Sequence, residues 1–183
     1  ILPNIGCTKQ PNVQDPGTTQ NNNETPDNNN DDEKSLEPGD FFPLMDGSRW
    51  EYEGEGNEYA GFNQEVIYTD GDLAQVRKDN GGTVSSTVYQ TTPGAVSVLF
   101  FQGETYDDSN YLKAEPNENY VVIKAPIAVG NQWETPHGTK EIVDLNASVE
   151  TPAGDFANCL KIKISHDNNA TSYEYFKENI GLV

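Results

Sequence analysis

The sequence has little of several residue types that catalytic and metal sites need. Among 183 residues there are two histidines, two cysteines and one methionine, and neither HExxH nor GxSxG occurs. Two histidines are too few for a three-histidine zinc site, and without GxSxG nothing marks a serine nucleophile. With 30 carboxylates, a pair at glycosidase separation would arise by chance. We therefore expect no catalytic residue, no cofactor and no metal.

Basic residues are also scarce. Eleven lysines and arginines stand against 30 aspartates and glutamates, and the formal net charge is −19. A surface this acidic is repelled by phosphate backbones and by anionic lipid headgroups. No apolar run approaches the roughly 20 residues that span a bilayer. We therefore expect no nucleic-acid partner, and any attachment to a membrane has to be covalent.

Apolar residues are missing mainly from the N-terminal part of the chain. Residues 8–40 contain no aromatic side chain, and Val13 and Leu36 are their only large apolar residues. Such a segment cannot bury enough apolar surface to offset the entropy lost on ordering. We expect residues 1–40 to be a signal remnant and a disordered tether. Residues 41–183 hold every Trp, Tyr and Phe and have the size of one domain.

The first seven residues, ILPNIGC, suggest how the protein is held at a membrane. Cys7 follows a short apolar stretch and Gly6, and it precedes the polar tether. This arrangement resembles the mature start of a bacterial lipoprotein, although Asn4 stands where such signals usually have leucine. We expect a lipid on Cys7 to anchor the protein to the bacterial membrane, outside the cytoplasm. A free thiol or a Cys7–Cys159 disulfide is the alternative.

Residues 41–183 have the pattern of short antiparallel strands. Stretches such as SRWEYEG and TVSSTVYQT alternate polar with aromatic or β-branched residues, and Gly, Pro, Asn and Asp separate them. Turn signals recur about every 8–12 residues, and no window has a sustained helical period. We expect an all-β antiparallel domain of roughly ten strands, as a curved sheet, barrel or sandwich. At most a short helical turn occupies residues 105–115.

One phrase occurs twice: PLMDGSRW at residues 43–50 and PIAVGNQW at residues 126–133. Each has glycine four residues after proline and tryptophan seven after it. Proline fixes the entry angle, glycine permits a positive φ, and a tryptophan at the start of a strand usually closes one end of a core. We expect Trp50 and Trp133 to be buried plugs at the start of two similar meanders. The other interpretation, two copies of a binding loop, requires an exposed tryptophan.

Four blocks resemble a family of secreted or lipid-anchored bacterial proteins, commonest in Firmicutes and known as hypothetical lipoproteins. The blocks are FPLMDGSRWEYEGEGNEY, PIAVGNQW, TPAGDFANCLKIKI and YEYFKENIGLV, and they cover most of the domain. The resemblance implies an antiparallel β-domain on a tether, with a further strand beyond Val183. It implies no mechanism, because its motifs are Gly, Pro and aromatic residues of structural type.

The remaining polar candidates have simpler structural explanations. His137 and His166 stand in polar turns and are expected to be solvated rather than catalytic, and Cys159 is expected to be an inert buried thiol. Clusters of oxygen ligands are common in β-turns for backbone reasons, so a structural Ca²⁺ site is only the alternative here. The clusters are Asp70/Asp72, Asp107/Asp108/Asn110 and Asp167/Asn168/Asn169.

Two classes of function remain, with an uncharacterised enzyme as a third. The first is a non-catalytic cell-surface binding or adhesion module, whose partner is a cell-wall glycan, a host glycan or a protein. The alternative is a carrier that holds an apolar ligand in a half-open barrel, with residues 96–101 and 120–127 as candidate walls. A carrier needs a continuous apolar cavity, whereas an adhesin needs an exposed patch on a solid core.

The last predicted strand, SYEYF, supplies the candidate ligand-binding residues. Tyr173 and Tyr175 share one face of the strand, and Glu174 and Phe176 share the other. If Phe176 points inward, the tyrosines face solvent beside the acidic turn at residues 167–169. Aromatic faces beside hydrogen-bonding acids suit carbohydrate, so we expect Tyr173 and Tyr175 to contact a glycan. The opposite register, with both tyrosines buried, is equally compatible with the pattern.

Overall fold

The computed structural model describes residues 35–183; Cys7 and residues 1–34 of the expected tether lie outside the described residues. The described part is nearly all β, which confirms the predicted fold class. One short 3-10 helix, η1 (Pro38–Phe41), precedes eleven strands. The lipid anchor on Cys7 and the location outside the cytoplasm stay predictions.

Two antiparallel sheets make up the domain, and in each the strands follow one another in sequence order. Sheet 1 contains β1 (Arg49–Tyr52), β2 (Phe62–Asp70), β3 (Leu73–Asp79), β4 (Val84–Thr91), β5 (Ala95–Gly103) and β6 (Tyr120–Lys124). Sheet 2 contains β7 (Gln132–Thr135), β8 (Gly138–Thr151), β9 (Gly154–Ser165), β10 (Thr171–Lys177) and β11 (Gly181–Leu182). Both sheets are therefore simple meanders.

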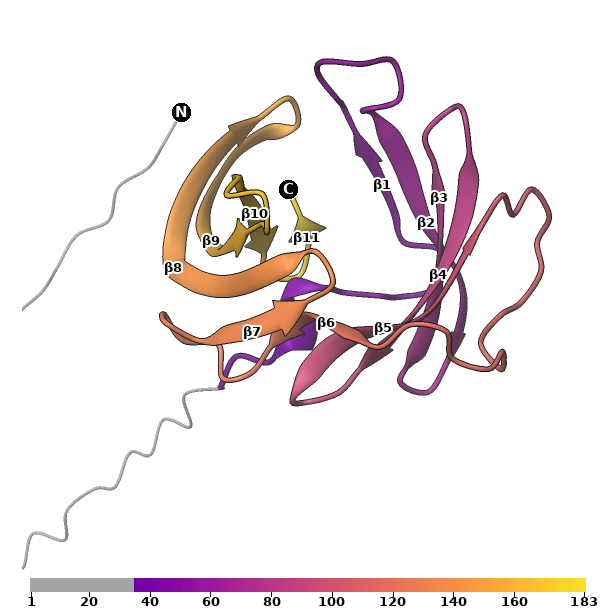
Figure 1. The fold of residues 1–183 in the computed structure, drawn as a ribbon, viewed down its shortest axis with the longest axis horizontal. Coiled ribbons are helices and arrows are strands. Elements are labelled where there is room, and N and C mark those ends of the chain that lie inside the picture. Colours follow the sequence, from indigo (N-terminus) through magenta and orange to yellow (C-terminus); the bar gives the residue numbers. More distant parts are fainter. Residues whose placement is uncertain (1–34) are drawn as a thin grey trace, which may run out of the picture. The chain divides into compact units, whose positions relative to one another are not determined.

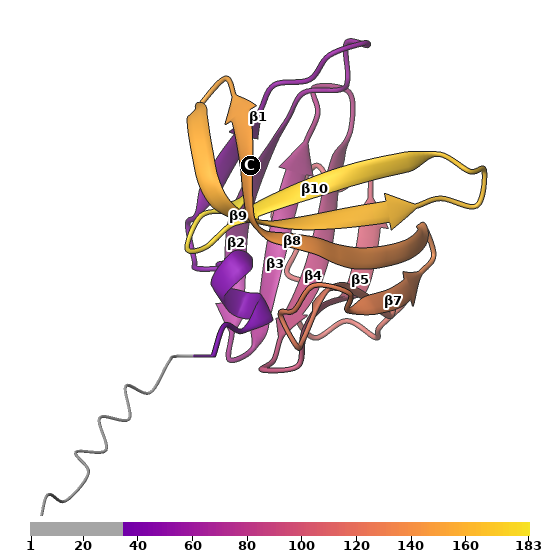
Figure 2. The ribbon, with the colours of Figure 1, turned by 90° about the vertical axis from the view of Figure 1, so that its left-hand side faces the viewer.

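The two sheets face each other, and the main core lies between them (Figure 1). Figure 2 shows that β8 and β10 cross the strands of sheet 1 at a steep angle, as in orthogonally packed sheets. The core contains Phe41, Ile123, Trp133, Ile142, Leu160, Ile162 and Phe176, all buried. A smaller cluster of Val66, Ala74 and Val76 lies against the inner face of sheet 1.

The β8–β9 hairpin gives sheet 2 its curvature. Its pairing shifts register three times, between Ile142 and Asp144, between Asp144 and Ala147, and between Ala147 and Val149. Each bulge adds an unpaired residue, bends the strand and increases its twist. The hairpin therefore curls around the core instead of extending as a flat ribbon (Figure 1).

The repeated phrase begins each meander, and its two copies make the same backbone contacts. Gly47 (φ +75°) and Gly130 (φ +89°) both occupy the left-handed region that favours glycine. The Gly47 N–H donates to Val66 O at 2.9 Å, and the Gly130 N–H donates to Ile142 O at 2.8 Å. In return, the Val66 N–H donates to Ser48 O and the Ile142 N–H donates to Asn131 O, each at 2.9 Å. The prediction of two similar meanders is thus confirmed.

Each tryptophan of the phrase links the first strand of its own sheet to the end of the other sheet. The Trp133 indole N–H donates to Val121 O on β6 at 3.0 Å, and the Trp50 indole N–H donates to Ile180 O, next to β11, at 2.7 Å. Trp133 is 6% exposed, so its role as a core plug is confirmed. Trp50 is only half-buried and packs on the smaller cluster, so its burial was overestimated.

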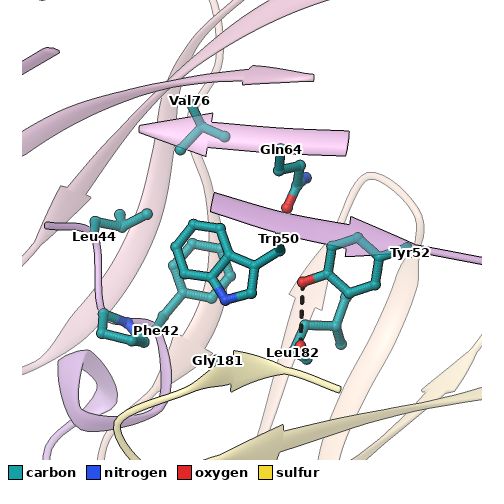
Figure 3. A pocket seen from close by; sticks show the side chains of 9 residues that line it. Phe42, Leu44, Trp50, Tyr52, Gln64, Val76, Gly181 and Leu182 are labelled. Carbon is teal, nitrogen blue, oxygen red and sulfur yellow. Dashed lines mark hydrogen bonds between the residues drawn. The ribbon is translucent and has the colours of Figure 1, made fainter. Parts of the chain in front are cut away.

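The half-buried tryptophan does not open a ligand site at the seam between β1 and β11. Figure 3 shows its indole beside Gly181, where an added Cβ would lie 3.6 Å from the indole nitrogen. The space left there is about 10 Å³, room for one water at most. Tyr52 completes the seam by donating to Leu182 O at 3.1 Å.

Tyr52 is expected to make stability fall at alkaline pH. Burial raises the pKa of Tyr52 to about 12, so the folded state keeps the phenol proton at a pH where the unfolded chain has lost it. The stabilisation is complete below about pH 10 and is lost as the pH rises toward about 12. Urea unfolding of Tyr52→Phe should show a shallower fall across that interval. The control Tyr173→Phe, at an exposed position, should show the same pH dependence of stability as the parent. If the stability of the parent does not change across this interval, the expectation is wrong.

The folded part begins a few residues before the expected boundary at residue 41. The compact unit starts at Ser35, and Pro38 and Phe41 in η1 are buried. Glu37 and Asp40 cap this helix, with the Glu37 N–H donating to the Asp40 carboxylate at 2.8 Å. From composition, residues 35–40 were predicted to belong to the tether, because they have few apolar atoms. These atoms are buried only because they pack against the folded domain.

Candidate functional site

A cavity of about 300 Å³ lies between the two sheets, and we call it the inter-sheet cavity. Sheet 1 and the segment before it contribute Phe42, Gln64, Tyr89, Val98, Tyr120 and Val122; sheet 2 and its turns contribute Thr135, His137, Lys140, Ile164, Glu174, Phe176 and Leu182. Most of the wall is aromatic or aliphatic, with a few polar groups. This volume and lining are typical of small-molecule sites.

A partly buried ion pair is the most polar part of the wall. Lys140 Nζ lies 2.7 Å from Glu174 Oε2, and the lysine residue is 7% exposed. Strand alternation explains why both point inward, since Lys140 shares its face of β8 with buried Ile142, and Glu174 shares its face of β10 with buried Phe176. The lysine also approaches Val122 O at 3.5 Å. A buried lysine needs such partners because the desolvation of an unpaired ammonium is costly.

Two tyrosines form the opposite wall. Burial raises the pKa of Tyr89, and the nearby phenol of Tyr120 adds to the rise. Burial likewise raises the pKa of Tyr120, followed by the negative charges of Glu118 and Glu174. Both phenols are therefore neutral at physiological pH and present hydroxyl groups and ring faces rather than charges.

Both histidines support the rim of the cavity. The His137 ring meets the Tyr120 ring edge to face, with centroids 5.5 Å apart. The His166 ring uses both nitrogens, with Nδ1 2.9 Å from His137 O and Nε2 2.9 Å from Ser172 Oγ. His166 is thus bonded into its surroundings rather than merely solvated. It joins the β7–β8 turn to the β9–β10 hairpin and thereby holds His137 against Tyr120.

Tyr173 and Tyr175 lie on the outer face of sheet 2, away from the inter-sheet cavity. Phe176 is 1% exposed and Tyr173 is 50% exposed, so the outward orientation of the tyrosines is the correct one of the two registers. Lys161 Nζ lies 4.3 Å from the Tyr173 ring centroid and 5.1 Å from that of Tyr175. The ammonium therefore covers part of the surface on which a sugar would stack. Their contact with a glycan stays a prediction.

Side-chain oxygens of the candidate calcium turns accept hydrogen bonds from other groups of the protein. Asp72 accepts from Gln90 at 2.7 Å, and Asn110 accepts from the Leu112 N–H at 2.9 Å. Within residues 35–183, no group of three or more His, Cys, Asp or Glu side chains is arranged to hold a metal ion. Cys159 is free and fully buried, as predicted, and burial raises the pKa of its thiol.

Part of the cavity wall was predicted from the sequence, but its ion pair was not. Val98, from residues 96–101, and Tyr120 and Val122, from residues 120–127, do line the cavity. Lys140 and Glu174 were not singled out, although each occupies a strand position on the same side as an apolar residue two places along. The available signal was a charged residue on the same face of a strand as apolar residues. To pair Lys140 with Glu174, one also has to know which strands are neighbours.

Searches of protein-family models, of curated proteins and of solved structures found no match to this chain. The resemblance of its four sequence blocks to lipid-anchored proteins therefore stays a prediction. In the part of the chain that the structure describes, no helix has the length and apolar character to cross a membrane.

Proposed function

We propose that this protein is a non-catalytic binding module that holds a small amphipathic molecule, neutral or cationic, in the inter-sheet cavity. The observation that carries the proposal is a largely apolar cavity of about 300 Å³ with one partly buried ion pair in its wall. Such sites bind through apolar contact and orient the ligand through a few polar groups. The proposal combines the expected binding module with the ligand cavity of a carrier.

The charge of the ligand follows from the charges around the cavity. The ammonium of Lys140 is already matched by Glu174 at 2.7 Å, so an anionic ligand would have to displace that carboxylate. The whole chain has a formal net charge of −19, which repels anions and attracts cations. Neutral tyrosine rings in the wall also favour a cation over an anion. These features support a ligand without negative charge.

Binding rather than catalysis is supported by the state of the polar groups. A hydroxyl group becomes a nucleophile when a histidine ring accepts its proton. The Thr135 hydroxyl in the cavity wall instead donates to Gly138 O at 2.8 Å. The Lys140 ammonium is held in an ion pair, which suppresses its nucleophilicity. These groups can fix a ligand's orientation by hydrogen bonding.

Binding of a neutral fluorescent probe tests the proposal. N-phenyl-1-naphthylamine should bind at one site per chain with enhanced, blue-shifted emission. Val122→Trp fills part of the cavity from a half-buried position and should weaken this binding by about tenfold or more, which corresponds to about 1.4 kcal/mol. Tyr173→Ala, on the outer face of sheet 2, is the control and should bind like the parent. Circular dichroism verifies the fold of each variant.

The anionic probe 1-anilinonaphthalene-8-sulfonate distinguishes charge selection from apolar binding alone. It should bind the parent at least about tenfold more weakly than the neutral probe, because like charges repel. Equal affinity for the two probes would refute the charge argument. Unchanged affinity in a folded Val122→Trp variant would place the probe outside the inter-sheet cavity and would refute the proposed function.

A further inference from the structure

A second concave site lies on the other side of sheet 1, under the long loop that joins β5 to β6, seen at the right of Figure 1. It is a hollow of about 400 Å³, which we call the outer hollow. Its lining consists of Gln102, Glu104, Thr105, Tyr106, Asp107 and Tyr111. Residues 104–111 thus supply most of its wall, and none of the lining is shared with the inter-sheet cavity.

A buried polar network fixes this loop to the sheet. Gln75 on β3 is fully buried; its side-chain N–H groups donate to Ser86 Oγ at 3.3 Å and Ser109 O at 2.9 Å. Its Oε1 accepts the Tyr111 N–H at 2.7 Å. Ser86 Oγ in turn lies 3.1 Å from the Thr105 hydroxyl, which is also buried. Satisfied buried networks of this kind hold a loop in one conformation.

A second attachment holds the loop at Asp108. The Tyr68 hydroxyl donates to Asp108 O at 2.8 Å, and Arg77 Nη1 lies 3.3 Å from Asp108 Oδ1. Glu104, at the start of the loop, has a φ of +56°, which is uncommon for a residue other than glycine. Such conformations persist only where the surroundings determine them, and they are enriched at ligand sites. The loop is therefore a rigid element that presents its side chains in defined positions.

Of the two aromatic residues in the outer hollow, Tyr106 is exposed and Tyr111 is half-buried with its ring held by a neighbour. Tyr106 is 65% exposed, the second highest exposure among the described large apolar and aromatic residues that face solvent. The Tyr111 ring stacks on Phe100 with centroids 5.1 Å apart and planes 20° apart, which fixes its tilt. Two tyrosines thus line a hollow in which Gln102, Glu104 and Asp107 carry groups that can form hydrogen bonds.

We propose that the outer hollow binds a neutral saccharide. Sugars present apolar C–H faces that pack on aromatic rings, and their hydroxyl groups donate to carboxylates such as those of Glu104 and Asp107. The same two carboxylates repel uronic acids and sulfated sugars. An apolar peptide fits less well, because it would take water away from these carboxylates without donating hydrogen bonds to them. The site is independent of the inter-sheet cavity, which lies against the opposite face of sheet 1.

Titration with defined oligosaccharides tests this site. The probes are maltohexaose, cellohexaose and hexa-N-acetylchitohexaose, with hexagalacturonate as the anionic counterpart, followed by amide NMR shifts of the folded protein. At least one neutral probe should shift the resonances of residues 102–111. Tyr106→Ala, at an exposed position that leaves the buried network intact, should weaken that binding about tenfold or more. Asp107→Asn should weaken it less.

Tyr59→Ala is the matched control, because Tyr59 is also an exposed tyrosine but lies in the β1–β2 loop and does not line the outer hollow. It should bind like the parent. Absence of shifts with all three neutral probes at millimolar concentration overturns the proposal. So does equal binding by folded Tyr106→Ala, or tighter binding of hexagalacturonate than of any neutral probe. Loss of binding in Tyr173→Ala but not in Tyr106→Ala would place the sugar on the outer face of sheet 2 and would also overturn the proposal. The fluorescent-probe result for the inter-sheet cavity does not bear on these outcomes.

Discussion

Trp133→Ala is expected to lower the free energy of unfolding by about 3–5 kcal/mol. Trp133 is 6% exposed and belongs to the main core between the sheets. The substitution leaves a large cavity because the rigid strands on either side cannot close around it. It also removes the indole donor from Val121 O, a bond of 3.0 Å that joins sheet 2 to β6. Urea unfolding followed by circular dichroism measures the loss.

The second copy of the phrase provides the internal comparison. Trp50→Ala should cost clearly less, about 2 kcal/mol, because Trp50 is half-buried and packs on the smaller cluster. Trp133→Phe keeps most of the ring volume but loses the N–H donor, so its cost should lie between zero and that of Trp133→Ala. A cost for Trp50→Ala equal to that of Trp133→Ala would contradict the different burial of the two copies.

Glu174→Leu is expected to destabilise the fold by about 3 kcal/mol. The substitution removes the partner of Lys140, whose ammonium then stays in a wall where the residue is only 7% exposed. Glu174 itself has a side chain that is 30% exposed, so most of the cost comes from the isolated lysine. Thermal and urea unfolding of the variant at neutral pH measure the effect.

The double variant Lys140→Met/Glu174→Leu separates the cost of an isolated charge from the value of the pair. It should regain most of the stability lost in Glu174→Leu, because apolar side chains can replace a buried ion pair at little cost. Glu150→Leu, at an exposed position on β8, is the control and should change stability by less than about 0.5 kcal/mol. If the double variant is no more stable than Glu174→Leu, the buried ammonium is not the source of the loss.

Local sequence pattern sufficed to predict the class of fold. Alternation and turn residues depend on neighbours within a strand or hairpin, so they indicated an antiparallel all-β domain of about ten strands, close to the eleven described. The repeated phrase indicated two meanders for the same reason, because its turn and its glycine act within a few residues. Burial of Trp133 and Cys159 also followed from strand pattern alone.

Contacts between residues far apart in the sequence decided everything that concerns the candidate sites. The half-burial of Trp50 depends on the distance between β1 and β11, and η1 is ordered because Pro38 and Phe41 pack on the domain rather than because of their own propensity. The pairing of Lys140 with Glu174 joins residues 34 positions apart across β9, and the polar network of Gln75 joins β3 to a loop more than 30 residues later. A period of two specifies the face of a strand on which a residue lies. It carries no information about which distant residue lies nearby, because that depends on which strands are neighbours in a sheet and on how two curled sheets cross and pack.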